Sequence, residues 1–121
     1  MAVGLSTTAA NALLTSLAGS YTWVQLHTAD PGANGTTAVA VETDRVQVTW
    51  SAPSNGAMSN SAQLQWTAVA GSEDYTHFSV WTASSAGTFG FSGTVTANAV
   101  TTGDTFTIPA GDLDVTIPRA S

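Results

Sequence analysis

The sequence predicts a mainly β protein: an antiparallel β-sandwich or jelly-roll-like fold of about seven or eight strands, with one short N-terminal helix. Two observations carry this prediction. From residue 21 onward, apolar residues alternate with polar ones, which is the period of a half-buried strand. Turn residues interrupt this alternation roughly every eight to twelve positions, a spacing typical of sandwiches. No linker or internal repeat divides the chain, so residues 1–121 are expected to form a single domain.

The expected helix covers about residues 6–18. Ser6 is a suitable N-cap, and Gly19 supplies a C-terminal stop. A helix of about three turns is marginally stable alone in water, so its apolar face must lie on the sheet. That face repeats at helical spacing and consists of Ala9, Ala10, Leu13, Leu14 and Leu17.

The strands are expected between about residues 21 and 118. In the first, residues 21–28, Val24 and Leu26 share one face while Gln25 and His27 share the other. A Pro and Gly turn ends it at 30–32. The later strands are expected at 38–42, 46–50, 63–66, 77–81, 89–95, 106–108 and 113–117.

Loops and turns are expected between these strands, because Gly, Pro, Ser and Asn gather there. Glu73 and Asp74 are assigned to a loop, and residues 84–87 to a hairpin turn. Residues 109–111 are expected to join the last two strands as a closing hairpin.

Charge is scarce in this chain. Asp, Glu, Lys and Arg make up 8% of it, against about 25% in an ordinary soluble domain, and lysine is absent. The formal net charge is -6, with Arg45 and Arg119 as the two basic residues. Nucleic acid and anionic membranes are therefore poor partners, whereas a neutral polar surface suits contact with other protein.

Cysteine is absent, which excludes disulfides and thiolate chemistry. No apolar run reaches the roughly 20 residues of a membrane span. The N-terminal apolar stretch has no basic residue before it, so we expect no signal peptide.

No catalytic, cofactor or metal site is predicted. His27 and His77 lie mid-strand among polar neighbours, and we expect hydrogen-bonded sheet-face histidines rather than a catalytic base. The carboxylates lack the spacing that gathers the six to eight oxygens calcium requires. They are expected to be solvated turn residues, with one or two ion pairs to Arg45 or Arg119. An enzyme is therefore not expected.

Four tryptophans are many for a small domain. Trp50 and Trp66 continue the apolar faces of their strands and are predicted to be core. Trp23 and Trp81 fall on the opposite face and are predicted either to pack under the helix or to form an intersubunit contact. Sugar binding by Trp23, Trp81 or a loop aromatic, Tyr75, is the alternative.

Several short blocks together resemble a family of small virion proteins of tailed bacteriophages, often labelled tail-fibre proteins. The most recognisable block is Leu26–Gly32, which reads LHTADPG. The chain departs from the family at 38–44, where an apolar and acidic stretch replaces a glycine-rich one. The other blocks are Asn11–Leu14, Val24–Gln25, Arg45 with Val48 and Trp50, Pro53 with Gly56, Thr76–Phe78, Val80–Trp81, Phe91–Gly93, Gly103–Thr105, Ile108–Gly111, Leu113 and Val115.

The resemblance implies a non-enzymatic virion structural protein, most simply a minor subunit associated with the tail or tail fibre. Its expected partners are copies of itself, as a homo-oligomer, and other virion proteins, bound through neutral sheet faces and edges. Two alternatives stay open: a capsid decoration protein, and a module that binds host-surface glycan. The expected location is the virion, in the tail rather than on the capsid surface, after synthesis in the host cytoplasm.

Overall fold

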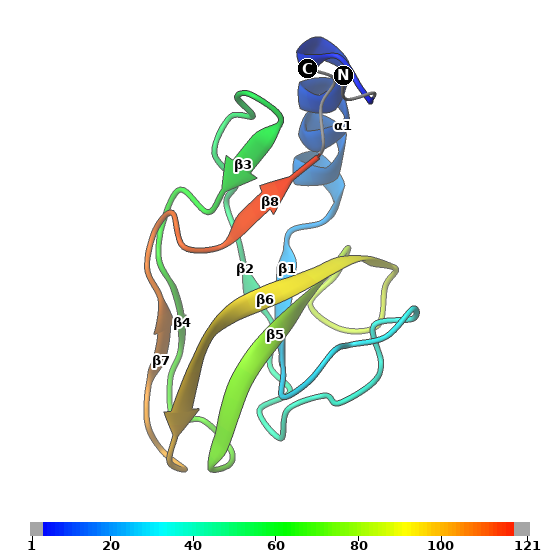
Figure 1. Cartoon of the computed structure of the whole chain (residues 1–121). Helices are drawn as coiled ribbons and strands as arrows, with labels where there is room; N and C mark the ends of the chain where they lie inside the picture. The colour runs from blue at the N-terminus through cyan, green and yellow to red at the C-terminus, as the bar shows by residue number, and fades with distance from the viewer. Residues whose placement is uncertain (1–3, 118–121) are drawn as a thin grey trace.

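The computed structural model describes residues 4–117, apart from the side chains of residues 97 and 98. This part of the chain is mainly β, as predicted, with antiparallel strands and a helix at its start (Figure 1). The elements are α1 (Thr7–Ser20), β1 (Trp23–His27), β2 (Val46–Gln47), β3 (Ala57–Ser59), β4 (Leu64–Trp66), β5 (Glu73–Trp81), β6 (Phe89–Val100), β7 (Phe106–Ile108) and β8 (Asp114–Thr116).

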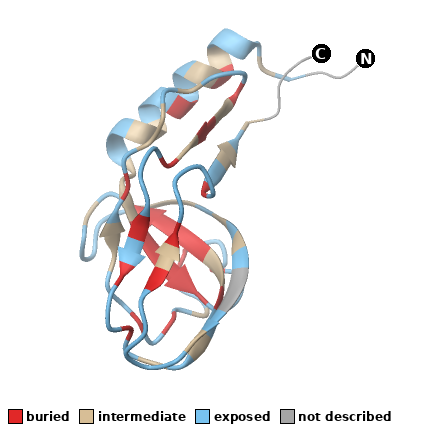
Figure 2. Cartoon of the chain, turned by 90° about the vertical axis from the view of Figure 1, so that its left-hand side faces the viewer, coloured by how far each residue is buried: buried red, intermediate tan, exposed pale blue. Residues whose placement is uncertain are grey.

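The strands form one larger sheet and two ladders. Four strands make an antiparallel sheet in the order β2-β1-β5-β6, while β4 pairs with β7 and β3 pairs with β8. Alternate residues of the sheet and of the β4–β7 ladder share a core that includes Val24, Leu26, Leu64, Phe78 and Phe106. The buried residues concentrate where the ladder faces the sheet, in a sandwich-like arrangement (Figure 2).

The helix begins where the sequence predicts. Ser6 is the N-cap, and its Oγ accepts a hydrogen bond from the Ala9 N–H at 3.1 Å. Ala10 and Leu14 are buried, whereas Leu13 is 49% exposed. The helix lies beside the β3–β8 ladder rather than over the larger sheet (Figure 1). Asn11 strengthens this contact, because its Oδ1 accepts from the Gly56 N–H at 2.9 Å.

Several strand predictions were wrong in their bounds. The segment 38–42 is no strand and makes one isolated bridge, between Val39 and His27. The segment 46–50 contributes only Val46–Gln47, and β3 was not expected at all. Glu73 and Asp74 belong to β5 instead of a loop, which extends that strand.

Carboxylates explain why 38–44 is not a strand. The Val41 N–H donates to both oxygens of Glu73, at 2.8 and 2.9 Å, and the Asp44 N–H donates to Glu42 Oε1 at 3.1 Å. These side-chain acceptors take the place of a neighbouring strand. Ala38 adds a left-handed turn, with φ of 53°. The acidic residues of this segment therefore have a structural role.

The last two strands do not form the expected hairpin. β7 pairs with β4 and β8 pairs with β3, so the turn at 109–111 carries the chain from one ladder to the other. Asn60, which is 1% exposed, holds this crossing. Its Nδ2 donates to the Pro109 carbonyl at 3.0 Å, and its Oδ1 accepts from the Leu113 N–H at 2.9 Å.

Candidate functional site: a polar groove beside the first strand

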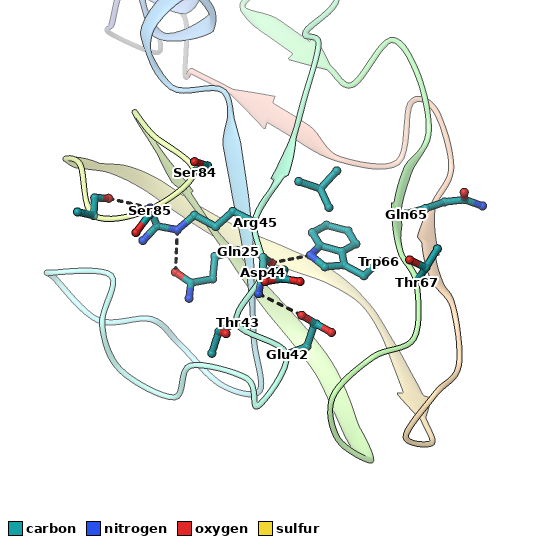
Figure 3. A pocket seen from close by; sticks show the side chains of 12 residues that line it. Gln25, Glu42, Thr43, Asp44, Arg45, Gln65, Trp66, Thr67, Ser84 and Ser85 are labelled. Carbon is teal, nitrogen blue, oxygen red and sulfur yellow. Dashed lines mark hydrogen bonds between the residues drawn. The ribbon is translucent and has the colours of Figure 1, made fainter.

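A polar groove of about 600 Å³ lies beside β1, between the segment 42–46, β4 and the turn at 84–86 (Figure 3). Its walls come from parts of the chain that are far apart in sequence. Its lining residues are mostly amides, hydroxyls and carboxylates: Gln25, Glu42, Thr43, Asp44, Arg45, Val46, Gln65, Trp66, Thr67, Ser84, Ser85 and Ala86.

Glu42 forms part of the wall of the groove. Only 5% of it is exposed, and its carboxylate accepts from the Asp44 N–H and the Ala70 N–H, each at 3.1 Å. These bonds join two loops that are 28 residues apart. Backbone donors therefore stabilise the buried charge, as a buried carboxylate requires.

Arg45 connects the groove to the β5–β6 turn. Its Nε donates to Gln25 Oε1 at 3.3 Å, and its Nη1 donates to the carbonyls of Ala83 and Ala86 at 2.9 and 2.7 Å. Figure 3 shows the side chain reaching toward this turn. All these acceptors are uncharged, so the expected ion pair is not what positions Arg45. Arg119, the other predicted ion-pair partner, lies outside the described residues.

Trp81 is covered by Arg45, whose guanidinium carbon lies 4.2 Å from the ring centroid. Phe89 packs against the same indole, with ring centroids 5.5 Å apart, and the Trp81 Nε1–H donates to Ser79 Oγ at 2.8 Å. Only 8% of Trp81 is exposed. Burial also lowers the pKa of Arg45. The pairing of Trp81 with this cation, rather than with α1, accounts for its burial.

The other predicted aromatics lie elsewhere. Trp23 is opposite Trp81 in the β1–β5 register and is partly exposed. Tyr75 was expected in a loop, but it lies in β5 and is fully buried, so it is no exposed ligand residue in the folded chain. Burial and the charges of Glu73 and Glu42 raise the pKa of Tyr75 to about 12.

Trp50 and Trp66 were predicted to be core. Trp66 is 2% exposed and its Nε1–H donates to the Asp44 carbonyl at 2.9 Å, which anchors the groove wall. Trp50 is partly buried against the core and donates to the Tyr21 carbonyl at 2.9 Å. Of the four tryptophans, Trp66 is the one that lines the groove.

His27 is fully buried and hydrogen-bonded, as predicted for a sheet-face histidine. Its Nδ1 lies 2.8 Å from the Thr37 carbonyl, which can only accept, so Nδ1 carries the proton. Its Nε2 then accepts from the Ser79 hydroxyl at 2.7 Å. Burial lowers the pKa of His27, which favours this neutral form.

The pair of Ser79 and His27 resembles a nucleophile and its base only in distance. Both residues are 0% exposed, and the third partner is a carbonyl rather than a carboxylate. His77 contacts Thr76 Oγ1 through Nδ1 at 2.8 Å. The part of the chain that the structure describes contains no group of three or more His, Asp or Glu residues able to hold a metal ion.

No helix within residues 4–117 is long and apolar enough to cross a membrane.

The sequence did not predict the groove. Most of its lining residues are ordinary polar residues, and they come from four separate segments, at 25, 42–46, 65–67 and 84–86, which no spacing along the chain joins. One signal was available: Arg45 is the one Arg or Lys between residues 4 and 117, where eight carboxylates lie. A lone cation in an acidic chain is expected to have a defined structural position.

Comparison with known proteins places most of the chain in one family model. Residues 4–116 match the model described as podophage GP4 fiber I protein gp80. The matched stretch includes every element from α1 to β8, together with the groove. No curated protein matches the chain.

Proposed function

Because the chain belongs to the family of podophage GP4 fiber I protein gp80, we propose that it is a non-enzymatic structural subunit associated with the tail fibres of a tailed-phage virion. The family match over residues 4–116 is the observation that carries this proposal. The structure adds a chemical reason. The buried groups that could do chemistry, His27, Ser79 and Glu42, are engaged in bonds that hold the fold together.

The surface we propose for assembly is the outer edge of β6. This strand is the last in the order β2-β1-β5-β6, so within the sheet it pairs only with β5, along one of its two edges. It runs over 12 residues and contains neither a charged residue nor proline. Soluble proteins usually protect such edges with charge, proline or short length. The opposite edge strand, β2, has only 2 residues.

A second copy of the chain is the partner we propose for this edge. An antiparallel pair of identical edges is self-complementary and closes by two-fold symmetry. The net charge of -6 is carried outside β6, so the two edges can approach without facing like charges on the paired strands. The β5–β6 register is regular over Phe91–Thr94, between two irregularities, and pairing is expected to centre there.

Cysteine cross-linking tests this edge, because the chain has no cysteine of its own. Thr94 is exposed on β6. Mild oxidation of the full chain carrying Thr94→Cys is expected to give a covalent dimer. Ser92→Cys and Thr96→Cys on the same strand test neighbouring registers. Thr49→Cys, equally exposed but outside β6, is the matched control. If none of the three β6 variants gives a higher dimer yield than the Thr49→Cys control, the result contradicts pairing through this edge.

The virion itself tests the wider proposal. Mass spectrometry of purified particles is expected to find the chain in many copies, and its absence would refute a structural role. Immunogold labelling distinguishes the tail from the capsid surface. Label spread over the capsid would favour the decoration protein that we keep as the alternative.

Trp23 is the predicted interface aromatic that we retain for contact with a neighbouring subunit. It is only partly buried, whereas Trp81 and Tyr75 are covered within the chain. Trp23→Ala is expected to reduce incorporation into particles while the purified chain stays folded by circular dichroism. Normal incorporation of this variant would remove Trp23 from the interface.

A further inference from the structure

The amide of Gln25 opens on the groove beside β1. Gln25 is only 8% exposed, and the donor-only Nε of Arg45 at 3.3 Å fixes its amide oxygen. The amide nitrogen therefore points the other way. Within residues 4–117 the buried side-chain polar atom without a partner is Tyr75 Oη, so Gln25 Nε2, which has no hydrogen-bond partner there, is accessible to solvent. Gln25 is one of the residues that line the groove. A nine-tenths buried residue of the groove lining therefore keeps an amide donor without a partner among the described residues.

Asp44 places an acceptor in the same groove. Its backbone is held at both ends, because its N–H donates to Glu42 and its carbonyl accepts from Trp66. The Asp44 side chain is exposed, and its carboxylate has no bond within the described part of the chain. The groove therefore holds a positioned donor and a charged acceptor. Hydroxyls surround them on Thr43, Thr67, Ser84 and Ser85.

These groups select against most ligand classes. Anionic ligands are disfavoured, because Glu42 and Asp44 are both acidic and Arg45 is engaged with carbonyls and Trp81. Apolar ligands are disfavoured by the polar lining. What remains is a neutral ligand with several hydroxyls, which can accept from the amide of Gln25 and donate to the carboxylate of Asp44. The volume of about 600 Å³ lies within the range of small-molecule sites.

We propose that this groove binds a neutral saccharide, with Gln25 Nε2 as donor and the Asp44 carboxylate as acceptor. The inference goes beyond the structural role and does not depend on it, because it concerns the isolated chain. It also differs from sugar binding by Trp23, Trp81 or Tyr75, since none of these three aromatics lines the groove.

Nuclear magnetic resonance titration of the ¹⁵N-labelled full chain tests the proposal. The probes are neutral hexoses and disaccharides, with glucuronic acid as the anionic comparison. We expect saturable shifts of the Trp66 indole N–H and of backbone amides at 43–45 and 84–86. A neutral sugar is expected to bind at least about tenfold more tightly than the uronic acid, because the carboxylate of the uronic acid would be repelled by the carboxylates of Asp44 and Glu42.

Two variants remove the proposed contacts one at a time. Asp44→Asn loses the charged acceptor and is expected to weaken binding by about tenfold or more. Gln25→Glu keeps an acceptor for Arg45 but loses the donor, and binding is expected to fall at least as far. The matched controls are Asp74→Asn and Gln47→Glu, both exposed and outside the groove. A retained amide spectrum verifies the fold of each variant.

Three results would overturn the site. The first is the absence of saturable shifts up to the solubility limit of every neutral sugar. The second is a shift pattern located away from the groove. The third is unchanged affinity in both Asp44→Asn and Gln25→Glu. None of these results bears on cross-linking through β6 or on the presence of the chain in virions, so the two proposals fail separately.

Discussion

Replacing Tyr75 with phenylalanine is expected to stabilise the protein. Tyr75 is 0% exposed, and its hydroxyl is buried without a hydrogen-bond partner in the described part of the chain. An unsatisfied buried hydroxyl costs about 1–3 kcal/mol. The ring itself contributes an edge contact with Phe106 at 4.9 Å between centroids, which phenylalanine retains. Tyr75→Phe therefore removes a cost and keeps the packing.

The expected gain is about 1–2 kcal/mol in the free energy of unfolding, once loss of part of the contact surface is allowed for. For a domain of this size, each kcal/mol corresponds to an increase of about 3–5 °C in the midpoint of thermal unfolding. Urea unfolding followed by tryptophan fluorescence measures the first quantity, and calorimetry measures the second. Tyr21→Phe is the matched control, because Tyr21 is only partly buried.

Alkaline pH should increase the difference in the free energy of unfolding between the parent protein and Tyr75→Phe. The pKa of Tyr75 is raised to about 12 in the folded chain, against an ordinary value near 10. Above pH 10 the unfolded state loses this proton while the native state keeps it. The stability of the parent then falls by up to about 1.4 kcal/mol per pH unit, and Tyr75→Phe lacks this loss. A variant that is less stable than the parent at pH 7, with no divergence above pH 10, would refute the reasoning.

Three further predictions concern the sheet and its loops. Burial lowers the pKa of His27, so as the pH falls the unfolded state binds a proton before the folded state does. The free energy of unfolding should therefore decrease below about pH 6.5, by at most about 1.4 kcal/mol per pH unit. His27→Gln should flatten this pH dependence in urea titrations. An alanine Cβ at Gly93 would lie 2.7 Å from Phe78 Cε1, so Gly93→Ala should lower the free energy of unfolding by about 1–3 kcal/mol. Unchanged stability in calorimetry would show that β6 can shift to make room for the methyl group. Glu73→Gln removes the charged acceptor of the Val41 N–H and should cost about 1–2 kcal/mol, with faster hydrogen exchange at the Val41 amide as its local signature.

Local features were predictable because the residues that form them are neighbours in sequence. The Ser6 cap needs only the N–H of Ala9, and the turn at 101–104 is closed by a local bond from the Asp104 N–H to the Thr101 carbonyl. Alternation likewise identified β4, where Leu64 and Trp66 are buried and Gln65 is exposed. In each case the pattern and its physical cause lie within a few residues.

Alternation does not tell which strand will pair with which. The strand count agreed with expectation only because β3 was missed while 38–42 was counted. The burial of Tyr75 was missed because its strand begins at Glu73, four residues before the expected start at 77, and the Glu73 carboxylate supports a distant loop. Such contacts join residues about 30 positions apart.

The sequence by itself determined the class of the fold, its low charge, the start of its helix and the resemblance to phage fibre proteins. Only the tertiary structure decided that β7 and β8 enter separate ladders, that Arg45 covers Trp81, and that Gln25 and Asp44 face one groove. The physical reason is the range of the interactions. Caps, turns and alternation are set by adjacent residues, whereas ladders and grooves depend on backbone donors and side chains that meet only after the chain has folded.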